Sequence, residues 1–109
     1  MQEDQGVSFG PYHLMGRRGP PMRRSLSVNL PPKALAVLWE LVARAGQVVT
    51  KEDLLTKVWV GTVVGEETLT TFIRLLRRAL KDDPHQPRYI ATAHRQGYRF
   101  IAEVQSSSL

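Results

Sequence analysis

Hydrophobic residues recur at helical spacing in three successive segments in the middle of the chain. The first segment opens at Pro31-Pro32, where proline suits the first helical turn, and it stops at Gly46. The second runs from Lys51 to about Trp59, behind Thr50, a good N-cap residue with Asp53 three positions later. Between them we expect Val48-Val49 to form a short extended link. The predicted core positions of these two helices are Leu35, Leu38, Leu41, Val42, Leu54, Leu55 and Val58.

The third segment has a clearly two-sided pattern. A loop containing Gly61 and Gly65 precedes it, and Asp82-Asp83-Pro84 stops it after Lys81. At about 100° per residue, one side of this helix carries Leu69, Phe72, Ile73, Leu76, Ala79 and Leu80. The opposite side carries Glu67, Thr70, Thr71, Arg74, Arg78 and Lys81, with Leu75 and Arg77 on the flanks. The pattern therefore predicts one face packed against a core and a basic face in solvent.

Alternating residues on both sides of the helices predict short strands. Residues 7–9 and 12–14 flank a turn at Gly10-Pro11, and Met22, Leu26, Val28 and Leu30 suggest a second pair of strands. Near the C-terminus, strand-like runs at 89–92 and 98–101 are joined by a hairpin tip at 93–97. We therefore predict one α+β domain over residues 7–104. Residues 1–6 are expected to be disordered, and residues 105–109, with three serines, to form a disordered tail or the start of a linker.

The composition narrows the chemistry that such a domain can perform. The chain has no cysteine, and His13, His85 and His94 lie far apart, so we expect no disulfide, metal or other cofactor. It has no phosphate-binding glycine loop and no nucleophile elbow, and we do not expect an enzyme or any catalytic residue. No apolar run reaches the roughly 18 residues of a membrane span, and the polar N-terminus is unlike a signal peptide, which favours a cytoplasmic location. The net charge of +5 favours an anionic partner.

The polar face of the third helix carries the side-chain types that read bases. Arginine can donate two hydrogen bonds to guanine, threonine can bond a base edge or touch a thymine methyl group, and glutamate can accept from cytosine. Leu75 is a candidate for apolar contact with thymine, while Arg77, Arg78 and Lys81 are candidates for phosphate contacts. The alternatives are an ordinary solvated helix, or a basic amphipathic helix that binds calmodulin or a membrane surface.

Two other basic segments flank this helix in sequence. Arg95, between His94 and Gln96 at the hairpin tip, can reach a minor groove or adjacent phosphates, although a plain exposed turn is the alternative. A second cluster, better explained as a solvated hairpin, consists of Arg17, Arg18, Arg23 and Arg24.

Several short motifs also occur together in a fixed order, namely Leu30–Leu38, Gly46–Leu55, Val58-Trp59, Leu69–Thr71 with Leu76–Leu80, and Gly97–Phe100. In this order and spacing, the chain from about Val7 to Val104 resembles the OmpR/PhoB-type winged-helix domain of bacterial transcriptional regulators. Within that family it is most similar to the ToxR/CadC-like one-component regulators. It departs from the family pattern at Arg95, where glycine is usual, at Arg24-Ser25 in place of Asp-Gly, and at Pro20-Pro21.

The resemblance implies sequence-specific binding of double-stranded DNA by a winged helix-turn-helix fold. That fold has an N-terminal four-stranded antiparallel sheet, three helices and a C-terminal β-hairpin wing. The recognition helix, residues 67–81, would enter the major groove, and the wing, residues 93–97, would touch the minor groove. The positions facing bases would be Glu67, Thr68, Thr71, Phe72, Arg74 and Leu75. The phosphate contacts would be Lys51, Trp59, Arg77, Thr92 and Tyr98, with core packing as an equal alternative for Trp59 and Tyr98.

The same resemblance suggests partners for the domain. The loop at 60–65 corresponds to the segment that often contacts RNA polymerase in the family, and tandem copies are expected on repeated half-sites. The control signal would lie elsewhere in a larger regulator, which can be membrane-anchored with this domain on the cytoplasmic side. The rival hypothesis is a protein-interaction or RNA-binding winged helix, although RNA modules usually stack bases on exposed aromatic residues, which are few in this sequence.

Overall fold

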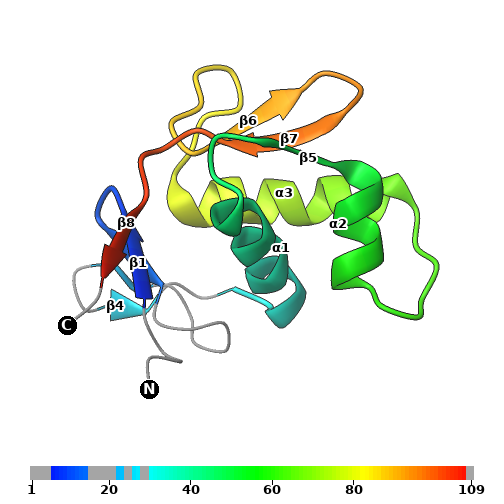
Figure 1. Ribbon diagram of the computed structural model, residues 1–109, viewed down its shortest axis with the longest axis horizontal. Coiled ribbons are helices and arrows are strands. Elements are labelled where there is room, and N and C mark those ends of the chain that lie inside the picture. The colour runs from blue at the N-terminus through cyan, green and yellow to red at the C-terminus, as the bar shows by residue number, and fades with distance from the viewer. Residues whose placement is uncertain (1–5, 15–21, 24–25, 28–29, 108–109) are drawn as a thin grey trace.

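A computed structural model describes residues 6–14, 22–23, 26–27 and 30–107 of the chain (Figure 1). Its helices are α1 (Pro32–Ala43), α2 (Lys51–Val58) and α3 (Glu66–Leu80). The local signals that predicted them are confirmed. Thr50 Oγ1 accepts a hydrogen bond from the backbone N–H of Asp53 at 3.1 Å, as expected of an N-cap, and α3 ends just before Asp82-Asp83-Pro84. Its C-cap is Lys81, which has a left-handed conformation with φ 58° that the sequence did not predict.

The N-terminal sheet has one more strand than the sequence predicted. β1 (Gly6–Phe9), β2 (Tyr12–Leu14), β3 (Met22–Arg23) and β4 (Leu26–Ser27) form the expected antiparallel set, and β8 (Gln105–Ser107) pairs with the outer side of β1 in the order β4-β3-β2-β1-β8. The prediction of a disordered tail was therefore wrong for residues 105–107, as was that of a disordered N-terminus for Gly6. Strand pairing uses backbone groups, which serines supply as well as any other residue. The rest of both predicted termini, and Val28 of the predicted strand, lie outside the described residues.

A second sheet contains the predicted hairpin and a strand that was not predicted. β6 (Ile90–Ala93) and β7 (Gly97–Phe100) form the hairpin, and β5 (Val48–Thr50) pairs with the other side of β7 in the order β5-β7-β6. The Val48-Val49 segment, expected to be a simple link, is thus the third strand of this sheet, with Val49 opposite Tyr98. Its partner lies far along the chain, so no local pattern identifies the pairing.

One core connects both sheets with the three helices. Phe9 and Tyr12 of the N-terminal sheet pack with Tyr89 and Phe100, and the neighbouring ring centroids lie 4.9–6.4 Å apart. The buried hydroxyl of Tyr12 donates to the carbonyl of Leu80 at 2.9 Å, so the N-terminal sheet also supports the end of α3. In Figure 1 this sheet lies at one end of the molecule, whereas α2 and the β6–β7 tip lie toward the other.

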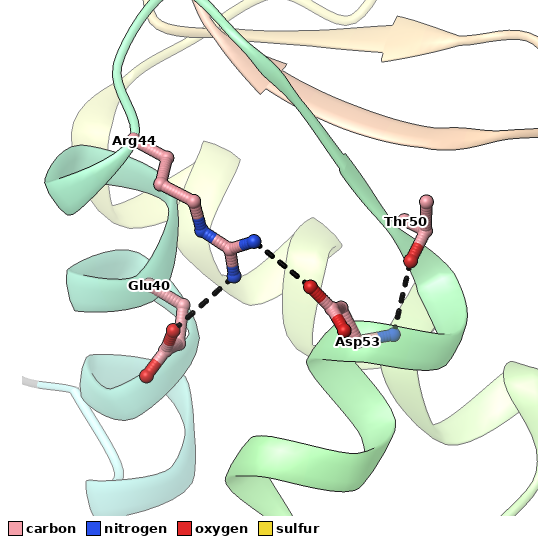
Figure 2. Close-up of polar contacts among 4 residues, drawn as sticks. All are labelled: Glu40, Arg44, Thr50 and Asp53. Carbon is pink, nitrogen blue, oxygen red and sulfur yellow. Dashed lines mark hydrogen bonds and ion pairs between the residues drawn. The ribbon is translucent and has the colours of Figure 1, made fainter.

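An ion pair fixes α2 relative to α1 (Figure 2). Arg44, just after α1, donates from Nη1 to Asp53 Oδ2 at 2.8 Å and from Nη2 to Glu40 Oε1 at 3.4 Å. The hydrogen bond from Arg44 holds the pKa of the Asp53 carboxyl below its ordinary value, and the same bond raises the pKa of Arg44. At the start of α2, Asp53 is therefore held twice: Thr50 binds its backbone N–H, and Arg44 binds its carboxylate.

Candidate nucleic-acid interface

The two faces of α3 are arranged as the sequence predicted. Leu69, Ile73, Leu76 and Leu80 are buried, while Glu67, Thr71, Arg74 and Arg78 are exposed. The remaining predicted base-facing positions, Thr68, Leu75 and Phe72, are half-buried at the edges of the exposed face. Phe72 packs against Trp59 with ring centroids 5.4 Å apart, which makes it part of the boundary with the core. The exposed face is therefore polar, with a carboxylate at one end and guanidinium groups toward the other.

The first half of this face is a shallow hollow lined by Glu66, Glu67, Thr70, Thr71 and Arg74. The Thr71 hydroxyl donates to the carbonyl of Glu67 at 3.0 Å, so its hydrogen is occupied within the helix. The hydroxyl lone pair and the methyl group of Thr71 are what this side chain can offer to a ligand. The Glu67 carboxylate folds back over Gly65, which has no Cβ to obstruct it.

Lys51 connects the start of α2 with both α3 and the hairpin tip. Its Nζ lies 3.3 Å from Glu66 Oε1, and its backbone N–H donates to the carbonyl of Gln96 at 3.1 Å. The predicted phosphate-contact residue thus sits between the first turn of α3 and the tip. Through Lys51, the start of α2 is thus joined both to the first turn of α3 and to the hairpin tip.

The hairpin tip is exposed and carries its cationic residue in an unusual conformation. His94 and Arg95 are both exposed, and Arg95 has φ 65°, a left-handed conformation that favours glycine. The backbone N–H of Gln96 donates to the carbonyl of Ala93 at 2.8 Å, which closes the turn. The turn therefore places arginine in a left-handed position, where the family resemblance leads one to expect glycine.

Two of the predicted phosphate contacts lie in the core. Trp59 and Tyr98 are 8% and 7% exposed, so the structure favours the packing alternative for both rings. Lys33 places its Nζ 6.0 Å from the centre of the Trp59 ring and donates to the carbonyl of Val58 at 2.9 Å. Only a small edge of either aromatic side chain remains accessible to a ligand.

Arg77 and Thr92, both expected from the resemblance to be phosphate contacts, contact each other. Arg77 Nη2 donates to Thr92 Oγ1 at 3.0 Å and to the carbonyl of Ile90 at 2.9 Å. Arg77 is half-buried, and its Nε is buried with no hydrogen-bond partner among the described residues. Its neighbours Arg78 and Lys81 are exposed and carry no such contacts to β6 in the part of the chain that is described.

Sequence reasoning missed the role of Asp82. The sequence predicts only that the third helix stops here, yet Asp82 is buried, at 8% exposed, and its carboxylate accepts from the backbone N–H groups of Arg88, Tyr89 and Ile90 at 2.7–3.3 Å. Asp82 thus holds the strand that follows at the end of α3. Because its partners are backbone groups six to eight residues later, no side-chain pattern points to it.

Other predicted features lie partly outside what can be described. Arg17, Arg18 and Arg24, as well as the side chain of Arg23, fall outside the described residues. Within the described ranges, no group of three or more acidic, cysteine or histidine side chains is placed to hold a metal ion. No helix in the same ranges is long and apolar enough to cross a membrane.

Comparisons with known proteins agree on one family. The model of the family "Transcriptional regulatory protein, C terminal" matches residues 25–100. The transcriptional regulator HilA of Salmonella typhimurium is 45% identical over 91 residues, which cover 84% of this chain and 16% of HilA. The transcriptional activator CadC of Escherichia coli is 31% identical over 83 residues, which cover 75% of this chain and 16% of CadC. The chain therefore spans only a small part of the length of these relatives.

Solved structures give the same result. The DNA-binding domain of Escherichia coli CadC superposes with a TM-score of 0.80 and 26% identity, covering 94% of this chain and 96% of that domain. The DNA-binding domain of Klebsiella pneumoniae RstA, solved in complex with the RstA box, superposes with a TM-score of 0.77 and 28% identity, covering 88% and 96%.

Proposed function

Because the chain belongs to the transcriptional regulatory protein C-terminal family and is a winged-helix DNA-binding domain of a transcriptional regulator, we propose that α3 enters the major groove of duplex DNA while the hairpin tip at 93–97 reaches the adjacent minor groove. The observation that carries this proposal is the exposed polar face of α3, opposite four buried aliphatic residues. An α-helix fits the width of the major groove, and a cationic tip suits the narrower one.

The base-reading residues in this proposal are Glu67, Thr68, Thr71, Arg74 and Leu75. Arg74 is exposed and forms the donor fork that pairs with guanine O6 and N7. Thr71 offers an acceptor and a methyl group, because its hydroxyl hydrogen is donated to Glu67. Glu67 is acceptor-only and matches the amino group of cytosine. The face therefore offers acceptors near its start and donors one to two turns later.

The phosphate contacts are assigned to cations and polar groups around this face. Arg78 is exposed on α3, Lys51 begins α2, and His94 and Arg95 occupy the tip. Charged side chains at these points neutralise phosphates and fix the register of the helix without reading sequence. Thr92 and the accessible edges of Trp59 and Tyr98 are the remaining candidates.

The burial of aromatic residues supports duplex DNA over single-stranded RNA as the ligand. Each Phe, Tyr and Trp of the chain lies among the described residues, and all are buried or half-buried. RNA modules that read single strands need exposed rings on which bases can stack. The rings of this domain pack inside it.

The domain is proposed to act as one part of a larger bacterial regulator in the cytoplasm, where promoter DNA is found. The loop at 60–65 is the candidate contact for RNA polymerase, and its Val60 and Val63 are 77% and 100% exposed. Tandem copies of the domain on repeated half-sites are proposed as the arrangement on DNA. The family resemblance supports both partners, and the exposure of Val60 and Val63 supports the polymerase contact.

Selection of duplexes from a random pool tests the proposal directly. The chain is expected to enrich one motif and to bind it with an affinity that falls with salt. The slope of log K against log salt concentration should be about −0.9 for each phosphate that the chain neutralises. Arg74→Ala should weaken binding to that motif by about 1–3 kcal/mol and relax one base position. Glu67→Gln should move the preference at its position from cytosine toward adenine, since glutamine pairs with adenine.

Lys57→Ala is the matched control, because Lys57 is an exposed cation on α2 outside the proposed interface. It should lower affinity for every duplex slightly and leave the motif unchanged. Equal binding to all duplexes by the wild-type chain would reduce the domain to a general polyanion binder and overturn the proposal.

A further inference from the structure

We propose that Arg77 is a positioning residue, which sets the wing at a fixed place relative to the recognition helix instead of contacting a phosphate. The inference rests on the proposed binding of α3 and the tip to adjacent grooves. It changes the role that the sequence suggested for this residue.

One amino group of the Arg77 guanidinium is bound to the wing, and the neighbouring Nε is buried. Nη2 is shared between the carbonyl of Ile90 and the hydroxyl of Thr92, at 2.9 and 3.0 Å, and Nε is buried. A phosphate contact requires donors that point outward, as the exposed Arg78 can provide. Of the two adjacent arginines, one thus faces the wing and the other faces solvent.

The contact is well placed to control the wing. Ile90 and Thr92 are alternate residues of β6, and β6 leads directly into the tip at Ala93. Two hydrogen bonds from one rigid guanidinium fix both the height and the rotation of this strand on α3. Sliding or twisting of β6 would break at least one of them.

Two further contacts hold the same hairpin at its other points. Asp82 accepts from the backbone N–H groups of Arg88, Tyr89 and Ile90 where the chain enters β6, and the carbonyl of Gln96 accepts from the backbone N–H of Lys51 at the tip. The hydrogen bonds of Arg77, in contrast, start from a residue within α3 itself. The groove-reading helix and the groove-reading tip are thereby connected through one side chain.

A fixed separation matters because the two grooves are themselves a fixed distance apart. If the wing moved freely, binding would have to order it, and this cost would reduce the affinity gained from the tip. Arg77 would remove that cost before DNA arrives. Its effect on binding should therefore pass through the wing and depend on Arg95.

Replacement by lysine separates the two roles. A phosphate contact needs mainly a charge, which Arg77→Lys keeps, whereas the contacts to Ile90 and Thr92 need a donor at the position of Nη2, which is one bond farther from Cα than the lysine Nζ. We expect Arg77→Lys and Arg77→Met to weaken binding of the selected duplex alike, by about fivefold to tenfold. Measured in the Arg95→Ala background, where the tip no longer contributes this cation, the slope of log affinity against log salt should stay unchanged for both. Arg99→Lys is the matched control, because Arg99 is an exposed arginine of β7 outside the assigned contacts, and it should bind as the wild type does.

Double-mutant cycles give the decisive measurement. Arg95→Ala should weaken binding in the wild-type chain but have little further effect in Arg77→Met, because the tip is then no longer held in place. Arg74→Ala should add fully to Arg77→Met, since Arg74 acts through α3 alone. General loss of stability would not produce this difference between the two cycles.

Thr92→Val tests the same contact from its other side, in case the Arg77 variants do not fold. It removes one acceptor at an exposed position and should reproduce part of the loss and of the coupling to Arg95. Wild-type-like binding by Arg77→Lys, additivity with Arg95→Ala, and a salt slope that is lower by about 0.9 in the double variant Arg77→Met with Arg95→Ala than in Arg95→Ala alone would identify a phosphate contact and overturn the inference.

A readout without DNA separates this inference from the proposed function. Hydrogen exchange at the amides of Gln96 and Tyr98 should be faster in Arg77→Met and Thr92→Val than in the wild type, whatever ligand the domain binds. Unchanged exchange in both variants would overturn the inference even if the wild-type chain binds DNA as proposed. Faster exchange in a chain that shows no duplex preference would instead count against the proposed function alone.

Discussion

Position 97 leaves no room for a side chain. Gly97 lies opposite Thr50 where β7 pairs with β5, and a Cβ on Gly97 would overlap the carbonyl oxygen of Val49 and lie 2.8 Å from Thr50 Cα. The sequence places Gly97 at the end of a turn, but the crowding comes from a strand far earlier in the chain. The cap at Thr50, by contrast, depends on Asp53 three residues later, so the local sequence predicts it correctly.

Gly97→Ala is therefore expected to destabilise the domain by about 2–4 kcal/mol, because backbone atoms must move apart to admit the methyl group. The free energy of unfolding, measured in urea, tests this. Gly61→Ala is the matched control, since Gly61 has φ 75° but nothing within 4 Å of a Cβ. That substitution should cost only the conformational penalty, about 1 kcal/mol. Equal losses in both variants would show that the approach of β5 to Gly97 is not what restricts this position.

The helices were more predictable than the strands because their signals are local. The apolar stripe of α3 and the residues at its ends specify its face and its limits without reference to the rest of the chain. β5 and β8 have three residues each, and their partners in β7 and β1 are distant in sequence. Short strands of this kind gain their stability from the neighbour, so composition alone indicated a link and a disordered tail.

The contact between α1 and α2 gives a prediction about acid. Because the hydrogen bond from Arg44 lowers the pKa of Asp53 in the folded state, the ionised carboxylate stabilises the fold above its unfolded pKa of about 4. This stabilisation is lost as the pH falls through the lower, folded value. Asp53→Asn should therefore be less stable than the wild type at pH 7, and the difference should disappear in acid.

Urea midpoints at pH 7 and at pH 3 or below test this, and the effect should be small because the Arg44 and Asp53 side chains are 29% and 44% exposed. Glu52→Gln is the control, since Glu52 is an exposed neighbour in the same first turn of α2. Its stability relative to the wild type should change less between the two pH values. A constant gap between Asp53→Asn and the wild type at every pH would mean that the ion pair does not contribute.

At the scale of the whole molecule, the candidate site was predictable in its parts but not in its assembly. The exposed face of α3 and the cationic tip both follow from spacing and turn chemistry. Their mutual placement depends on contacts between segments that are separate in sequence, such as Arg77 with Ile90 and Asp82 with Tyr89. A sequence pattern reports which side of an element faces the core, but it does not report which backbone groups a buried polar side chain will meet.

The C-terminal strand offers a test of how independent the two ends of the molecule are. β8 covers the edge of β1 through pairs such as Val7 with Ser106, at the end of the molecule away from the hairpin tip (Figure 1). Ending the chain after Val104 removes these pairs and should lower the free energy of unfolding by about 1–2 kcal/mol, with faster hydrogen exchange in β1. Because an open edge strand can pair with another chain, the shortened protein should also self-associate more readily.

DNA affinity at low protein concentration should nevertheless match that of the full chain, since neither α3 nor the tip contacts β8 through any hydrogen bond found among the described residues. Anisotropy titrations with the selected duplex, together with thermal melts of both chains, separate the two effects. A fall in affinity at a temperature where both chains are fully folded would mean that the N-terminal sheet takes part in binding. The interface would then extend beyond the polar face of α3 and the wing, to the opposite end of the domain.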